Sequence, residues 1–123
     1  MRRIDTNILL RYLLDDHQEH SRRAAGIIEE NHVGVSTEVV CEVVYVLSGV
    51  YKVPRSEIRD TLHQVAHHPN IEILDQQLVC HAADSYAVQN LDFVDALLLA
   101  HHQLHGDMIE TFDRKLTACL KSR

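Results

Sequence analysis

Four carboxylates, Asp5, Glu42, Asp95 and Asp113, are the residues of this sequence best suited to chemistry. Asp5 follows a short stretch predicted to be a strand, and open α/β sheets bind their ligands just beyond the carboxyl ends of the strands. Hard oxygen ligands gathered at one point repel one another unless a cation lies between them. Carboxylate and water oxygens suit Mg²⁺ or Mn²⁺, and such an ion would activate water for phosphodiester hydrolysis.

Three of these carboxylates also have a structural interpretation. Asp92 and Asp95 suit the N-cap and first turn of one predicted helix, and Asp113 suits the N-cap of the last helix. Asp5 could cap the helix that begins at about Asn7. The metal hypothesis therefore rests on convergence, because Asp5 and Asp113 both follow predicted strands and Asp95 begins the helix that leads into the last strand.

Glu42 is the most informative of the other carboxylates, because it interrupts the apolar run VVCEVV of a helix that can expose little of itself. A carboxylate buried there needs a partner. The alternative is that Glu42 shares a narrow solvated stripe with Glu38. If Glu42 faces bulk solvent, the site composed of these four carboxylates is wrong.

The elements that must position these side chains alternate along the chain. Strands are expected at Ile4 and at 32–35, 71–74 and 108–111, and helices at 7–14, 20–31, 37–50, 56–66, 76–89, 93–105 and from 113 onward. This alternation predicts parallel βαβ units with helices on both faces of one sheet. The chain, residues 1–123, has the length of a single domain.

The formal net charge of −6 argues against broad electrostatic binding of nucleic acid. Scarce aromatic residues also make a base-stacking platform a poor expectation. Local basic patches remain, and they could flank an acidic centre. They comprise Arg2, Arg3, Arg11, Arg22 and Arg23 near the N-terminus, and Arg114, Lys115, Lys121 and Arg123 near the C-terminus.

Cysteine and histidine usage favours neither a disulfide framework nor zinc. Cys41, Cys80 and Cys119 form no CxxC pair, so we expect buried thiols in a reducing compartment. His101 and His105 have the spacing of a metal pair but lack the accompanying glutamate of a zinc motif. Apolar runs are far too short to span a bilayer, and we expect a cytoplasmic protein with no membrane partner.

Four segments in this order resemble PIN-domain ribonucleases, in particular the VapC-like toxins of bacterial toxin and antitoxin pairs. They are IDTNILLRYLLDD, VVCEVVYVLSGVY followed by KVPRSEI, LDFVDALLLAHHQLHGD, and TFDRKL. The resemblance implies a three-layer α/β/α sandwich with a short, mainly parallel central sheet. Relatives often add a further short strand after the last segment, so four or five strands are implied.

The resemblance also implies a function and a site. It implies an endoribonuclease that cuts RNA with water activated by Mg²⁺ or Mn²⁺, a homodimer, and silencing by a small antitoxin protein. Asp5, Glu42, Asp95 and Asp113 would be the catalytic and metal-binding residues, supported by Asn7, Asp92 and Thr111.

Two other classes of function are compatible with the residues. A phosphotransferase of the haloacid-dehalogenase type would use Asp5 as nucleophile, but it needs a second aspartate where this chain has Asn7. A non-catalytic module with the same fold would use its acidic groove to bind a basic partner peptide.

Overall fold

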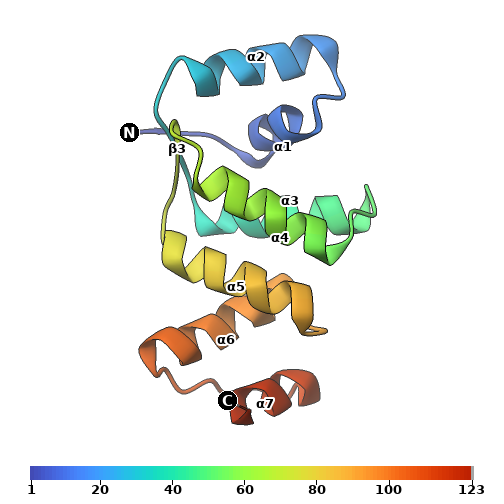
Figure 1. Cartoon of the computed structure of the whole chain (residues 1–123), viewed down its shortest axis with the longest axis vertical. Helices are drawn as coiled ribbons and strands as arrows, with labels where there is room; N and C mark the ends of the chain where they lie inside the picture. Colours follow the sequence, from blue (N-terminus) through green and yellow to red (C-terminus); the bar gives the residue numbers. More distant parts are fainter. Residues whose placement is uncertain (123) are drawn as a thin grey trace.

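The computed structural model describes residues 1–122, within which there are seven helices and three strands (Figure 1). Two helices follow each of the first two strands, and three follow the last. In chain order the elements are β1 (Arg2–Arg3), α1 (Thr6–Leu14), α2 (Gln18–Glu29), β2 (Val33–Val35), α3 (Thr37–Gly49), α4 (Arg55–Ala66), β3 (Ile71–Ile73), α5 (Gln76–Val88), α6 (Phe93–His105) and α7 (Arg114–Lys121). The predicted helices are therefore all present, with ends shifted by a residue or two. Arg123 lies outside the described residues.

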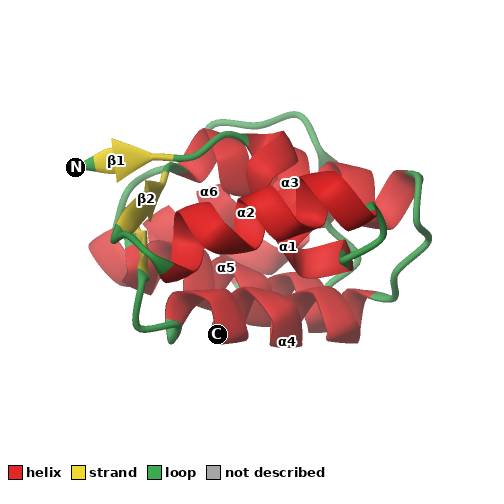
Figure 2. Ribbon diagram, turned by 90° about the horizontal axis from the view of Figure 1, so that it is seen from above, coloured by secondary structure: helices red, strands yellow, loops and turns green. Residues whose placement is uncertain are grey.

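The strands form one parallel sheet in the order β1-β2-β3, which confirms the α/β class. Arg2 pairs with Val33, and Gly34 pairs with Glu72, so β2 is the central, fully buried strand. Strands of two or three residues cannot cover a wide core. They lie along one side of the molecule (Figure 2), and helices supply most of the buried surface.

The expectation of four or five strands is wrong for the described residues, because 108–111 forms no strand. Its apolar side chain Ile109 instead packs against a second, small core around Leu91, Leu99 and Leu116. Met108 is 86% exposed. The segment thus buries its apolar residue against α6 and α7 without pairing with the sheet.

The main core joins β2 and β3 to the inner faces of α1, α3, α4 and α5. Val33, Val35, Ile71 and Ile73 fill its strand side. Tyr86 and Phe93 pack edge to face, with ring centroids 5.8 Å apart, where α5 turns into α6. This contact fixes the start of α6 against the core, which matters because the carboxylates of interest lie there.

Helix α3 is less enclosed than its composition predicts. Val40, Val43, Val44 and Leu47 are buried, but Tyr45 is 81% exposed and Val50 is 68% exposed. Its β-branched residues pack on one side against α1, α4 and α6, and no element within residues 1–122 covers the opposite side. The side of α3 that is open to solvent carries Glu38, Glu42 and Tyr45, and the exposed Val50 follows the helix.

Candidate functional site

Three aspartates of the predicted site region cap helices. The backbone N–H groups of Ile8, Asp95 and Leu116 donate to the Oδ1 atoms of Asp5, Asp92 and Asp113 at 3.0, 2.9 and 2.8 Å. A carboxylate there satisfies an N–H with no partner inside the helix and lies at the positive end of the dipole. Each cap engages one carboxylate oxygen, so capping and metal binding are compatible roles.

Asp95, in the first turn of α6, is half-buried. Burial raises the pKa of its carboxyl group, and the negative charges of Asp92 and Asp113 raise it further. The starts of α6 and α7 therefore lie close enough for their carboxylates to repel one another. Asp92, which the sequence suggested only as a supporting residue, belongs to this group.

Glu42 is exposed, whereas the metal hypothesis expected it to be buried on α3. Its neighbour Cys41 links it to the other acids. Burial raises the pKa of the Cys41 thiol, followed by the charges of Glu38, Asp92 and Glu42. The acidic side of α3 therefore lies near the N-terminus of α6, and Cys41 lies between them.

Asp5 is exposed at the N-terminus of α1, and its charge is not among those that raise the pKa of Asp95 or Cys41. Within residues 1–122, no three His, Cys, Asp or Glu side chains lie close enough together to hold one metal ion. The four carboxylates are thus not within reach of a single ion in this structure. The physical reason lies partly in segment 108–111, which does not pair beside β1 and so does not carry Asp113 to the edge where Asp5 lies.

The supporting residues hold their neighbours in different ways. Thr111 Oγ1 accepts a hydrogen bond from the N–H of Asp113 at 3.0 Å, and Thr117 Oγ1 donates to the carbonyl of Asp113 at 2.7 Å. These contacts orient the turn into α7. The turn at Asp5 is held by the N–H of Ile8, and Asn7 lines a small cleft between α1 and α2.

A larger groove of about 670 Å³ adjoins the acidic group. Cys41 and Asp92 lie in its wall, together with the exposed side chains Tyr45, Val50 and Val94. Its lining is mainly apolar. The groove therefore extends the open face of α3 to the start of α6.

Arg55, the first residue of α4, also lines this groove, and sequence reasoning missed it. Its guanidinium lies over the Tyr86 ring, with Cζ 4.2 Å from the centroid. Nη1 donates to the carbonyl oxygens of Tyr86 at 3.0 Å, of Gln89 at 3.3 Å, and of Leu91. The arginine thus ties down the connection that ends at Asp92. No local pattern marks this role, because its partners lie more than thirty residues away.

The histidines on α6 make local contacts. His101 Nδ1 lies 3.7 Å from a carboxylate oxygen of Asp107, and His102 Nδ1 lies 2.8 Å from the Asp107 carbonyl oxygen. These contacts hold the chain where α6 ends at Gly106, whose φ of 73° is the left-handed conformation that glycine adopts without strain.

Comparison with known families decides the identity of the fold. Residues 3–119 match the family described as PIN domain. The chain belongs to the PIN-domain family. PIN domains are commonly nucleases, which supports a hydrolase. No curated protein and no solved structure matches the chain. Among the described residues, no helix of this PIN domain is both long and apolar enough to cross a membrane.

Proposed function

We propose that this PIN domain is a Mg²⁺- or Mn²⁺-dependent endoribonuclease. The observation that carries the proposal is the proximity of three carboxylates at the starts of α6 and α7, where burial and then the charges of Asp92 and Asp113 raise the pKa of Asp95. Like charges held this close cost free energy unless a cation offsets them. The donor set consists of carboxylate oxygens, which suits Mg²⁺ or Mn²⁺ better than zinc.

The residues that would hold the ion are Asp5, Glu42, Asp95 and Asp113. Each capping aspartate has an oxygen left over after its hydrogen bond to the helix. Asp95 and Asp113 already lie close together, whereas Asp5 and Glu42 would have to move toward the ion, and the exposure of Glu42 counts against its role as a ligand. Asp92 and Thr111 support the site, Asp92 by capping α6 and Thr111 by holding the turn into α7, and Asn7 contributes beside Asp5.

When bound, the ion would supply a nucleophilic water and offset the charge that develops on the phosphate. The chain itself supplies orientation. The N-termini of α1, α6 and α7 add partial positive charge behind the carboxylates, which moderates their repulsion toward an RNA phosphate. Without the cation, the acidic group would repel that phosphate, so cleavage should require the metal.

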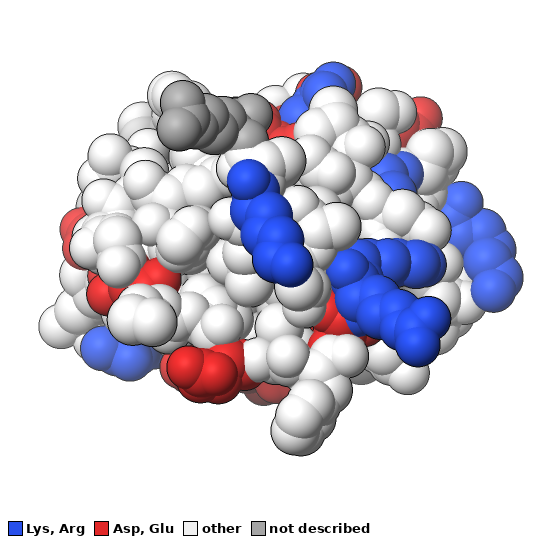
Figure 3. Space-filling view, turned by 90° about the horizontal axis from the view of Figure 1, so that it is seen from below, with Lys and Arg blue, Asp and Glu red and all other residues white. Residues whose placement is uncertain are grey.

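Basic residues outside the acidic group would bind the RNA backbone. Exposed Arg2 and Arg3 lie on β1, and exposed Arg114, Lys115 and Lys121 lie on α7. Figure 3 views the molecule from the α7 end and shows lysine and arginine side chains across that face, with acidic ones among and below them. This mixture fits local phosphate contacts on a chain whose net charge is −6.

We further propose that the protein is a cytoplasmic, VapC-like toxin that forms a homodimer and is silenced by an antitoxin protein. The groove beside α3 has three exposed apolar side chains, Tyr45, Val50 and Val94, which support a protein partner at this groove. Large exposed apolar side chains around one groove are typical of an interaction surface.

A non-catalytic PIN module is the second candidate. Two observations favour it. The carboxylates are not gathered around one point within the described residues, and the larger groove is mainly apolar. Such a module would bind a protein partner and would have no need of a metal ion.

RNA cleavage with and without Mn²⁺ separates the two candidates. The parent chain should cut single-stranded RNA with Mn²⁺ but not with EDTA, whereas Asp5→Asn and Asp95→Asn should lose at least 99% of the activity. Asp60→Asn is the matched control, because Asp60 is an exposed aspartate on α4 that contacts only its neighbour Arg59. Equal cleavage by all four proteins would rule the acidic site out. No cleavage by a folded parent chain would favour the binding module.

A further inference from the structure

A second, smaller cleft of about 180 Å³ lies between α1 and α2. Asn7, Ile8 and Arg11 line it from α1, and His20, Arg23 and Ile27 line it from α2. Arg11 lies three and four residues after Ile8 and Asn7, and His20, Arg23 and Ile27 are also spaced by three or four residues, so each set lies on one helix face. The cleft is therefore a product of the packing of α1 on α2.

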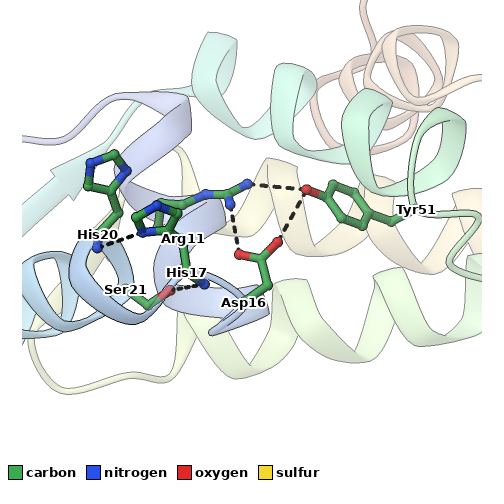
Figure 4. A network of polar contacts seen from close by, with 6 residues as sticks. All are labelled: Arg11, Asp16, His17, His20, Ser21 and Tyr51. Carbon is green, nitrogen blue, oxygen red and sulfur yellow. Dashed lines mark hydrogen bonds and ion pairs between the residues drawn. The ribbon is translucent and has the colours of Figure 1, made fainter.

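The polar groups of the cleft are cationic or hydrogen-bond donors, and none of the lining residues is acidic. Arg11 is held rigidly, since Nη1 donates to Asp16 Oδ1 at 2.7 Å and Nη2 donates to Tyr51 Oη at 3.2 Å (Figure 4). Its Nε is buried and makes no hydrogen bond within the described residues. At least this one N–H of the guanidinium is therefore left without an acceptor from residues 1–122.

Arg23 adds a second guanidinium to the cleft, and His20 adds a ring nitrogen that can donate a hydrogen bond. Within residues 1–122, no carboxylate lies within ion-pair distance of Arg23, whose side chain is exposed. The His20 ring stacks on His17 with centroids 4.1 Å apart, which fixes it beside the cleft. Figure 4 shows both rings at the α2 end of the network, away from Tyr51. An anion entering the cleft would meet donors from both helices.

The cleft lies next to the first predicted catalytic residue. Ile8 lines it, and the N–H of Ile8 is the group that donates to Asp5. A volume near 180 Å³ is several times that of a water molecule, which suits one phosphate group and leaves little room for a nucleoside. The cleft is therefore placed to take a charged group close to Asp5.

We propose that this cleft binds one backbone phosphate of the RNA strand, beside the phosphate that is cut at the acidic site. The assignment rests on the proposed ribonuclease function. RNA is favoured over an acidic peptide because its phosphates recur at every nucleotide, so a strand cut at Asp5 always presents a neighbouring phosphate to the adjoining cleft. Arg11 and Arg23 hold that phosphate, and His20 and Asn7 donate to it.

Binding of a labelled single-stranded RNA ten-mer tests the proposal without requiring cleavage. The background is the Asp95→Asn chain in Mg²⁺, with gel electrophoresis to verify that the RNA stays intact. Arg23→Gln should weaken binding about three- to tenfold and reduce the salt slope by about 0.7, the value for one phosphate contact on a single strand. Arg22→Gln is the matched control, because Arg22 is exposed on the same helix but does not line the cleft.

Arg22→Gln should change the affinity less than twofold. Equal losses for Arg22→Gln and Arg23→Gln, or no loss for either, would overturn the phosphate site. A glutamate ten-mer that binds as tightly as the RNA, and loses as much affinity in Arg23→Gln, would overturn it in favour of an acidic protein segment. A nuclease whose RNA affinity still depends on Arg23, but whose cleavage survives Asp5→Asn and Asp95→Asn, would refute the acidic site and leave this cleft standing.

Discussion

The backbone N–H of Asp95 donates to the side chain of Asp92 at 2.9 Å, so the hydrogen bond that caps α6 also keeps the Asp95 carboxylate close to the Asp92 carboxylate. The hydrogen bond favours the helix, but the two negative charges disfavour each other. At the start of α6 the capping hydrogen bond is therefore favourable, and the repulsion between the two carboxylates is unfavourable. That balance can be measured through pH, metal binding and the chemistry of nearby groups.

The Asp95→Asn variant should gain stability relative to the parent chain as pH rises. Folding raises the pKa of Asp95, so its favourable contribution is complete below the ordinary value near 4 and is lost as pH rises through the raised value. Asparagine does not titrate. Urea unfolding in EDTA from about pH 3 to about pH 6 should therefore show a widening difference in favour of the variant. A constant difference would mean that Asp95 carries no unfavourable charge in the folded chain.

Mn²⁺ should stabilise the parent chain and leave Asp95→Asn nearly unchanged. An ion at a hundred times its Kd adds about 2.7 kcal/mol to the free energy of unfolding, which corresponds to roughly 10 °C in Tm for a domain of this size. Differential scanning calorimetry at pH 7 measures the shift. The Asp60→Asn control should respond like the parent. Equal shifts in all three proteins would place the ion elsewhere.

Alkylation of Cys41 should report the same binding event. Burial and the charges of Glu38, Asp92 and Glu42 raise the pKa of this thiol, which keeps the reactive thiolate scarce at pH 7.5. A cation bound beside Asp92 and Glu42 offsets part of that charge, so Mg²⁺ should accelerate modification by iodoacetamide about two- to fivefold.

Cys80 is the internal reference for this experiment. Burial and the charge of Asp84 raise the pKa of its thiol, and Asp84 is not one of the proposed ligands. Peptide mass spectrometry follows both cysteines in one sample. The expected result is acceleration at Cys41 alone, and equal acceleration at both cysteines would contradict it.

Replacing Arg55 should destabilise the connection between α5 and α6, which ends at Asp92. Arg55→Ala removes three hydrogen bonds to backbone carbonyls and the stacking on Tyr86, which together should lower the free energy of unfolding by about 2–4 kcal/mol. Arg55→Lys should recover less than half of this, because an ammonium group cannot reproduce the planar fork. Arg59→Ala, on the same helix, should cost less than about 1 kcal/mol, since its ion pair with Asp60 is exposed.

Local sequence patterns were sufficient to predict every helix of the described chain. Ser36 caps α3 through Val39, and Gly106 ends α6, as their residue types indicate. The fourth strand was wrong because the alternation in 108–111 is equally compatible with an irregular segment. Its apolar residue Ile109 is partly buried against the small core around Leu91, Leu99 and Leu116, and that tertiary contact is not visible in the local pattern.

The candidate site was predictable in part. Asp95 and Asp113 were chosen as converging carboxylates, and the structure brings their charges together with that of Asp92. The sequence left open whether Glu42 is buried or shares a solvated stripe with Glu38, and both side chains are exposed in the structure. The choice depends on which side of α3 the rest of the chain covers. The role of Arg55 could not be predicted either, since its partners lie far along the chain, at Tyr86 near the end of α5 and at Gln89 and Leu91 after it.

Segment 107–111 connects α6 to α7 without regular structure, while Leu116 of α7 is fully buried in the small second core. Asp113 is therefore brought to α6 by this segment, and the burial of Leu116 holds α7 in place. Segment 107–111 sets the effective concentration of the Asp113 carboxylate at Asp95. The length of this segment changes that concentration without changing α6 or α7. Lengthening it with glycine and serine would dilute Asp113 at the acidic group while the capped start of α6 stays as it is.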